Sequence, residues 1–352
     1  MNLPRDQYAH SDTLRLRYWL EGAGDQNLVL IHGIGGAVEV WRKQFEHLPS
    51  THRLLAVDLP GCGRSDIPDE YPPDTLRLFA TAVRDVMAQA GMEQATVIGS
   101  SLGGAVAIEF AARWPEMVAS MVLVGPAGMN GSIAWPLRLM AIPGIGELLT
   151  QPDRARTAQA IRQCVADPQT VEDEDIDRAY EMACLPGARG AFLSLLRTYA
   201  GVRGVDKREL RRLQFCMRRI HAPVLVLWGT DDHILPATAA ATALTFFPQT
   251  GLIVREGMGH LIFIEEPAWF DATVRAFVQA PHAFLATTAQ QPDAPGQLAR
   301  AGREPAGLIP ALPARLPARF SPRTLAIASF GLVALLAIQR VRQHSSESSG
   351  MV

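Results

Sequence analysis

The sequence of 352 residues is poor in lysine and has no surplus of positive charge. Lys43 and Lys207 are its only lysines, and 33 basic residues stand against 35 acidic ones, for a net charge of -2. A nucleic-acid-binding protein needs a basic surface to neutralise phosphates. We therefore expect no nucleic acid among the partners. The excess of arginine, with many Ala and Pro residues, is typical of a GC-rich bacterial genome.

Cysteine is also scarce, and the start of the chain lacks an apolar run. The four cysteines contain no C-x-x-C pair, which argues against a disulfide framework and a thiolate zinc site. We expect neither a metal nor an organic cofactor. Residues 1–20 hold no continuous apolar segment, so a cleaved secretory signal is not expected. These features favour a cytoplasmic protein. The cysteines are Cys62, Cys164, Cys184 and Cys216.

A long uncharged apolar stretch lies near the C-terminus, from Leu325 to Ile338, between Arg323 and Arg340. A helix over Thr324–Gln339 would rise about 24 Å, which is short of the roughly 30 Å hydrocarbon core of a bilayer. Its apolar residues occur all round the helix and not on one stripe. We predict an apolar helix over 324–342, either a membrane anchor or a helix docked on its own domain or on a partner.

Residues 281–323 separate this stretch from the rest of the chain. They contain eight prolines and ten alanines and no sustained hydrophobic period. This composition is typical of a flexible linker. We therefore predict a globular body over 1–280, tethered through the linker to the apolar tail.

Within the body, short apolar runs alternate with segments of helical periodicity, the pattern of a mostly parallel sheet with helices on both faces. The alternation stops after Val124, and 129–220 reads as an inserted helical cap between two parts of the core, 1–128 and 221–280. The acidic run Glu172–Asp175 in the cap is expected to face solvent. The predicted strands are Leu14–Leu20, Leu28–Ile31, Leu54–Val57, Thr96–Ile98, Met121–Val124, Val224–Trp228 and Leu252–Val254.

The strongest local signal is the motif G-S-S-L-G-G that begins at Gly99. It follows the predicted strand Thr96–Ile98 and precedes a segment of helical pattern, which is the setting of a nucleophile elbow. Such a turn holds its serine in a strained backbone conformation. Gly99 and Gly103 would leave room for neighbouring chain. Ser101 is therefore the candidate nucleophile.

A serine hydroxyl needs a base, and the base needs an acid that fixes its tautomer. His260 lies in the loop after the last predicted strand and would reach the sheet edge at which Ser101 lies. Asp231 and Asp232 follow the strand Val224–Trp228, and either could be the acid.

The negative charge that develops on the substrate oxygen also needs donors, usually two backbone N–H groups. Leu102, the residue after the nucleophile, would supply one. Ile34 would supply the other, because it lies in the loop H-G-I-G-G that follows the strand Leu28–Ile31. We expect His32 and Gly33 in that loop to be structural, with His32 fixing the loop.

Taken together, the chain resembles the α/β-hydrolase fold superfamily over about residues 10–280. The resemblance rests on H-G-I-G-G at His32, D-L-P-G-C-G-R-S at Asp58, G-S-S-L-G-G at Gly99, W-G-T-D-D-H-I-L-P at Trp228 and G-M-G-H at Gly257, in this order. In relatives with a W-G-x-x-D-x-x-x-P pattern the aspartate is the triad acid, which implies Asp232 here. The implied order of Ser101, Asp232 and His260 is also that of the family.

The resemblance implies a serine hydrolase that forms an acyl-enzyme on Ser101. We expect a small-molecule carboxylic ester as substrate, with a hydrophobic, lipase-like preference favoured by the apolar start of the cap. The alternatives are a carbon–carbon bond hydrolase, a lactonase, a cofactor-free haloperoxidase or a non-catalytic binding protein of the same fold. Proteins that cleave carbon–carbon bonds of aromatic ring-fission products often have Asn before the serine and Met after it. Ser100 and Leu102 stand there in this chain.

Overall fold

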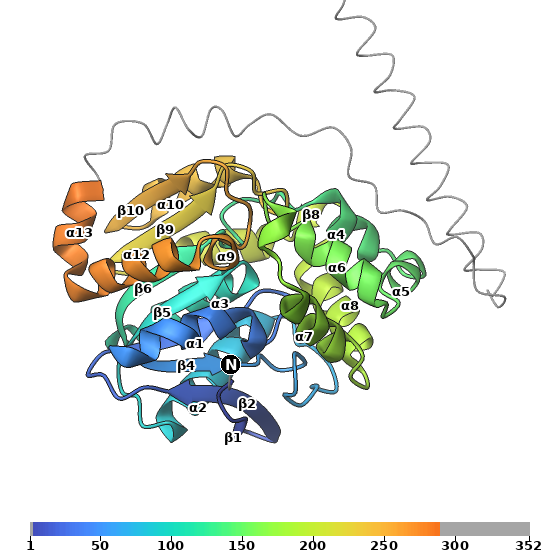
Figure 1. Ribbon diagram of the computed structural model, residues 1–352. Helices are drawn as coiled ribbons and strands as arrows, with labels where there is room; N and C mark the ends of the chain where they lie inside the picture. Colours follow the sequence, from blue (N-terminus) through green and yellow to red (C-terminus); the bar gives the residue numbers. More distant parts are fainter. Residues whose placement is uncertain (1–2, 289–352) are drawn as a thin grey trace, which may run out of the picture.

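The computed structural model describes residues 3–288, and an eight-stranded sheet forms its centre (Figure 1). The strand order is β1-β2-β4-β3-β5-β6-β9-β10, in which β1 and β2 are antiparallel to their neighbours and the other six strands are parallel. Six of the seven predicted strands lie within the parallel set and the seventh is β2, while β1 was not predicted. The strands are β1 Gln7–Ser11, β2 Leu14–Glu21, β3 Asn27–Ile31, β4 Arg53–Val57, β5 Ala95–Ser100, β6 Val118–Val124, β9 Val224–Gly229 and β10 Thr250–Arg255.

Helices cover both faces of the sheet because successive side chains of a strand point to opposite faces. On β3, Val29 and Ile31 pack into the core under α2 and α3, while Leu28 and Leu30 pack into the core that contains α11 and α12. The sheet is therefore buried on both sides, as the continuous apolar runs of the sequence predict. The helices of this part are α1 Arg42–His47, α2 Thr75–Gln89, α3 Leu102–Arg113, α10 Ala241–Phe246, α11 Ile262–Glu265 and α12 Pro267–Gln279.

The segment predicted as a cap lies between β6 and β9 and is helical, apart from the short hairpin of β7 and β8. Figure 1 shows α4 to α8 gathered at one side of the sheet. The elements are α4 Trp135–Met140, α5 Ile145–Leu149, α6 Arg154–Arg162, α7 Asp173–Ala183, α8 Ala188–Tyr199, β7 Ala200–Gly201, β8 Gly204–Val205 and α9 Lys207–Met217.

The predicted start of the linker at residue 281 is wrong. Residues 281–288 form helix α13 (Pro281–Thr288), which packs against the edge strand β10. Leu285 is buried in the core, and Leu285 and Thr288 lie over Gly251, where a Cβ atom would come within 2.7 Å of both side chains. The proline-rich composition hid this helix, because Pro281 fits the first turn of a helix without loss of a hydrogen bond.

The predicted apolar helix over 324–342 and the remainder of the predicted linker lie outside the described residues. Among residues 3–288, no helix is both long enough and apolar enough to cross a membrane.

The acidic run Glu172–Asp175 faces solvent only in part: its first three residues are exposed, as expected, whereas Asp175 is largely covered. Arg42 of α1 donates to Asp175 at 2.7 Å and to Glu172 at 2.5 Å, and Lys43 lies 3.1 Å from Glu172. Arg42 is buried and Asp175 is 9% exposed, so this contact is shielded from water. The run therefore joins the cap helix α7 to the core. Sequence alone does not show this, because the partners are about 130 positions apart.

We expect Arg42→Gln to lower the free energy of unfolding by about 2–3 kcal/mol, because Asp175 would keep its burial and lose its charged donor. Urea unfolding measures the change, and limited proteolysis should show earlier cleavage in the cap. Arg178→Gln is the matched control, since Arg178 forms only an exposed pair with Glu174 within α7 and should matter by less than about 0.5 kcal/mol. Equal effects of the two substitutions would contradict this account.

Candidate active site

Ser101 occupies the sharp turn between β5 and α3. Its backbone has φ 54° and ψ -120°, a region that residues with a side chain rarely adopt. The conformation is held from both sides: the Ser101 N–H donates to the carbonyl of Val124 at 3.0 Å, and the Ser101 carbonyl accepts from Ala127 at 2.9 Å and Gly104 at 3.0 Å. The turn is thus fixed by the strand β6 and the loop that follows it.

Glycine is required at two positions of this turn. A Cβ atom on Gly99 would lie 2.4 Å from the carbonyl oxygen of Gly103, and one on Gly103 would lie 2.2 Å from that of Ile31. Both neighbours are backbone atoms, which cannot rotate away. The spacing of these glycines in the sequence therefore reflects close packing of three stretches of chain around Ser101.

His260 and Asp232 form a hydrogen-bonded pair, as the sequence predicts for a base and its acid. His260 Nδ1 lies 2.7 Å from Asp232 Oδ2, and both residues are buried. The other oxygen, Asp232 Oδ1, accepts from the N–H groups of Ile234 and Leu235 at 2.9 and 2.8 Å, which fixes the carboxylate. Asp231 is exposed. Of the two aspartates left open by the spacing in the sequence, Asp232 is the one that is hydrogen-bonded to His260.

Gly125 brings this pair to the nucleophile turn. It follows Val124, which accepts from Ser101, and a Cβ atom on Gly125 would lie 2.9 Å from His260 Nδ1 and 3.1 Å from Asp232 Oδ2. Four segments that are far apart in the sequence therefore meet at the ends of β5, β6, β9 and β10. No hydrogen bond joins the Ser101 hydroxyl to His260 among the described residues. Hydrogen bonds between catalytic groups often form only once the substrate is bound.

The loop expected to complete the oxyanion site lies beside Ser101. A Cβ atom on Gly33 would lie 3.0 Å from Cβ of Ser101, so the two segments of the chain are in contact. The N–H of Leu102 is in the first turn of α3, where no intrahelical acceptor exists. Ile34 follows Gly33 directly. The geometry suits the two donors that the sequence predicts.

His32 holds this loop and carries no charge. Its Nε2 accepts from the N–H of Leu59 at 3.1 Å, and its Nδ1 donates to the carbonyl of Gly33 at 2.7 Å. The side chain is fully buried, and burial lowers the pKa of His32 to about 4. The contacts fit the structural role expected for His32.

A buried charged cluster supports the same loop and was not predicted. Asp58 accepts from the N–H of Val38 at 2.7 Å and from that of Arg64 at 2.8 Å, and the next residue, Leu59, holds His32. Arg17 lies on the other side of Asp58, at 3.1 Å.

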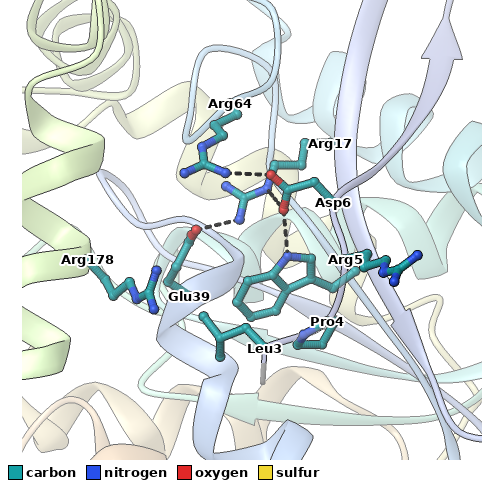
Figure 2. Close-up of a pocket in the computed structure, with 9 residues that line it drawn as sticks. Leu3, Pro4, Arg5, Asp6, Arg17, Glu39, Arg64 and Arg178 are labelled. Carbon is teal, nitrogen blue, oxygen red and sulfur yellow. Dashed lines mark hydrogen bonds and ion pairs between the residues drawn. The ribbon is translucent and has the colours of Figure 1, made fainter. Parts of the chain in front are cut away.

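Figure 2 shows Arg17 between Asp6 and Glu39 at the wall of a cavity of about 300 Å³. Burial alone would lower the pKa of Arg17, but Asp58 and Glu39 raise it, so the guanidinium is charged. The motif at Asp58 was the only signal in the sequence for this cluster, since Arg17 looks like an ordinary residue of an edge strand.

The cap packs over the site. Ser101 is 9% exposed and His260 is 4% exposed. A Cβ atom on Gly35 would lie 3.2 Å from the ring of Phe192 in α8, so the cap packs on the oxyanion loop. Among residues 3–288, no group of three His, Cys, Asp or Glu side chains could hold a metal ion.

We expect the native protein to have a higher free energy of unfolding than the His32→Gln variant, and we expect this difference to shrink as the pH falls from about 6.5 to about 4. The pKa of His32 is lower in the folded state than the value of about 6.5 in the unfolded chain. Between these values the unfolded state binds the extra proton, and stability is lost as the pH falls. The glutamine side chain of the variant cannot titrate.

Urea unfolding of both proteins across this pH range measures the change. Taking the difference between them removes the contribution of every other titrating group that the substitution leaves unchanged. We predict that the gap in the free energy of unfolding narrows by a few kcal/mol. A gap independent of pH would mean that His32 is not held neutral.

Comparison with known proteins agrees with this architecture. The family model described as alpha/beta hydrolase fold matches residues 26–267. An uncharacterized protein of Mycobacterium tuberculosis is 28% identical over 284 residues, covering 78% of this chain and 81% of the relative. The 2-hydroxymuconate semialdehyde hydrolase of a Pseudomonas species is 29% identical over 256 residues, covering 71% of this chain and 86% of the relative.

Solved structures show the same fold. The 2-hydroxy-6-oxo-6-phenylhexa-2,4-dienoate hydrolase of a Rhodococcus species superposes with a TM-score of 0.67 at 23% identity, covering 78% of this chain and 99% of that one. The family match spans more than half of the chain, and the sheet, the turn at Ser101 and the inserted helices fit it. The chain belongs to the α/β-hydrolase fold family and is an α/β-hydrolase enzyme.

Proposed function

We propose that the protein is a serine hydrolase in which Ser101 is the nucleophile. His260 removes the proton of the hydroxyl as its oxygen attacks the carbonyl carbon of the substrate. Asp232 orients the imidazole and stabilises its protonated form. The N–H groups of Ile34 and Leu102 bind the oxygen that becomes negative. The leaving alcohol takes the proton from His260, and water then releases the acid from Ser101.

The observation that carries this proposal is the meeting of the His260–Asp232 pair with the strained turn of Ser101 at Gly125. A positive φ at a serine stores strain, which a fold keeps at functional sites. A buried carboxylate on the imidazole of His260 is also the arrangement that fixes a base with one nitrogen free.

We favour a carboxylic ester with an apolar acyl group as the substrate. Two apolar side chains of the cap lie on the loops near the site: Phe192 lies on Gly35, and Leu213 lies on Gly128 beside the hydroxyl of Tyr199. A pocket between these side chains would be lined largely by hydrocarbon, which suits an apolar acyl chain. A carbon–carbon bond hydrolase is the second candidate, because relatives at 26–29% identity carry the names of such enzymes.

The membrane tether through 324–342 remains a proposal that rests on the sequence of that segment. A lipid-like ester would be delivered from the membrane surface, so the two proposals are compatible. On this account the body is on the cytoplasmic side of the membrane.

A substrate series tests the choice of ester. We expect kcat/KM for p-nitrophenyl esters to rise from acetate to octanoate, because each buried methylene adds about 0.8 kcal/mol of binding. Ser101→Ala should lower kcat by about 10³-fold or more. Faster turnover of 2-hydroxy-6-oxo-6-phenylhexa-2,4-dienoate than of every ester would instead establish the second candidate. Saturable binding of these compounds without turnover of any of them would indicate a binding protein.

A pair of neighbouring aspartates tests the assignment of the acid. We expect Asp232→Asn to lower kcat by about 10⁴-fold, because the amide would present an N–H group to His260 and favour the wrong tautomer. Asp231→Asn is the control, with a change of the same chemistry one residue away on an exposed side chain. Steady-state kinetics on the best ester measures both. The reverse order of effects would move the acid to Asp231.

A further inference from the structure

Glu265, at the end of α11, lies between the loop of His260 and the cap. Its Oε2 accepts from the N–H of Gly259 at 2.7 Å, directly before His260. Its Oε1 accepts from two N–H groups of the cap, those of Ala166 at 2.7 Å and Asp167 at 3.2 Å. One carboxylate therefore binds both segments at once.

The same two segments also meet without Glu265. The carbonyl of Cys164 accepts from the N–H of His260 at 2.8 Å and from that of Leu261 at 3.0 Å. A Cβ atom on Gly259 would lie 2.6 Å from the nitrogen of Ala166. The loop of the catalytic histidine is thus packed directly on the connection between α6 and the following turn of the cap, with no room for a side chain between them.

The charge of Glu265 is balanced by peptide dipoles. The side chain is buried, and burial raises the pKa of Glu265 while the three N–H groups act against that rise. Asp167 lies nearby and is itself acidic, so it also raises the pKa of Glu265. A glutamine at this position would have one acceptor oxygen and one NH₂ group, so it could not accept from Gly259 and from the cap together.

We propose that Glu265 is a positioning residue that holds the loop of His260 in register with the cap, so that the base is correctly placed only when the cap is closed. This inference rests on the proposed role of His260 as the base. It assigns to the cap a second task besides covering the substrate: the cap fixes the imidazole through the Gly259–His260 backbone.

Inactivation by a fluorophosphonate separates positioning from binding. The rate constant kinact depends on proton removal from Ser101, whereas KI reports binding of the reagent. We expect Glu265→Gln to lower kinact by about 10- to 100-fold, since small misplacement of a catalytic group costs that much, and to leave KI unchanged. An unchanged kinact in the folded variant, or a change in KI alone, would overturn the proposal.

Glu266→Gln is the matched control. It removes the same charge one residue away, where Glu266 pairs with Arg255 at 2.8 Å on the surface. This variant should keep both constants. Should Glu265→Gln not fold, Gly259→Ala separates the same two segments from the other side and should lower kinact in the same way.

Amide hydrogen exchange tests the coupling without catalysis. We expect Glu265→Gln to speed exchange together in peptides that cover 164–167 and 257–261, with no change in Glu266→Gln. If the native protein were not modified by the reagent, the proposed function would fail, and exchange would still decide whether Glu265 couples the segments. Unchanged exchange in either segment would contradict the coupling.

Discussion

The backbone at Ser101 is the constraint on which the rest of the site depends. A serine at φ 54° is stable only if its surroundings leave no better conformation, and here the strand β6, its following loop and the start of α3 supply the three hydrogen bonds that hold it. The glycines of the turn have no side chain, so the C-terminal end of β3 can lie in contact with the turn that follows β5. The same approach places the loop after β3 beside Ser101.

His260, the proposed base, is held differently from Ser101. The hydrogen bonds that fix Ser101 come from β6, the loop after it and the first turn of α3, all parts of the core, whereas His260 is fixed by Asp232 of the core and by Cys164 of the cap. An inserted segment thus takes part in building the site that it covers. The ion pairs of Arg42 with α7 hold the same insertion to the core at another point. Our proposal that cap position and the placement of His260 are linked rests on this arrangement.

Much of the fold and the site could be predicted from the sequence because the signals are local. Continuous apolar runs mark strands buried on both faces, and the motif at Gly99 and the loop at Gly257 mark ends of strands on one edge of a parallel sheet. Asp232 and Asp231 could not be separated by spacing alone, since the choice depends on which side chain turns toward His260. Nothing in the sequence indicates that the carbonyl of Val124 accepts a hydrogen bond from the N–H of Ser101.

The residues missed are charged groups whose partners are remote. Arg17, Arg42 and Glu265 each look like solvated positions, and their role appears only when the chain brings a carboxylate or a set of N–H groups to them. Helix α13 was missed for another reason. It begins with Pro281 and lies in a proline-rich stretch, a composition typical of a linker, although proline is well tolerated in the first turn of a helix. Burial of polar groups is a property of the folded chain and not of a short window.

The most direct measurement of the central claim is the site of covalent modification by a fluorophosphonate, mapped by intact and peptide mass spectrometry. The account predicts a single adduct on Ser101, absent in Ser101→Ala and strongly reduced in His260→Ala. An adduct elsewhere, or no adduct in the folded native protein, would contradict an activated serine at this turn.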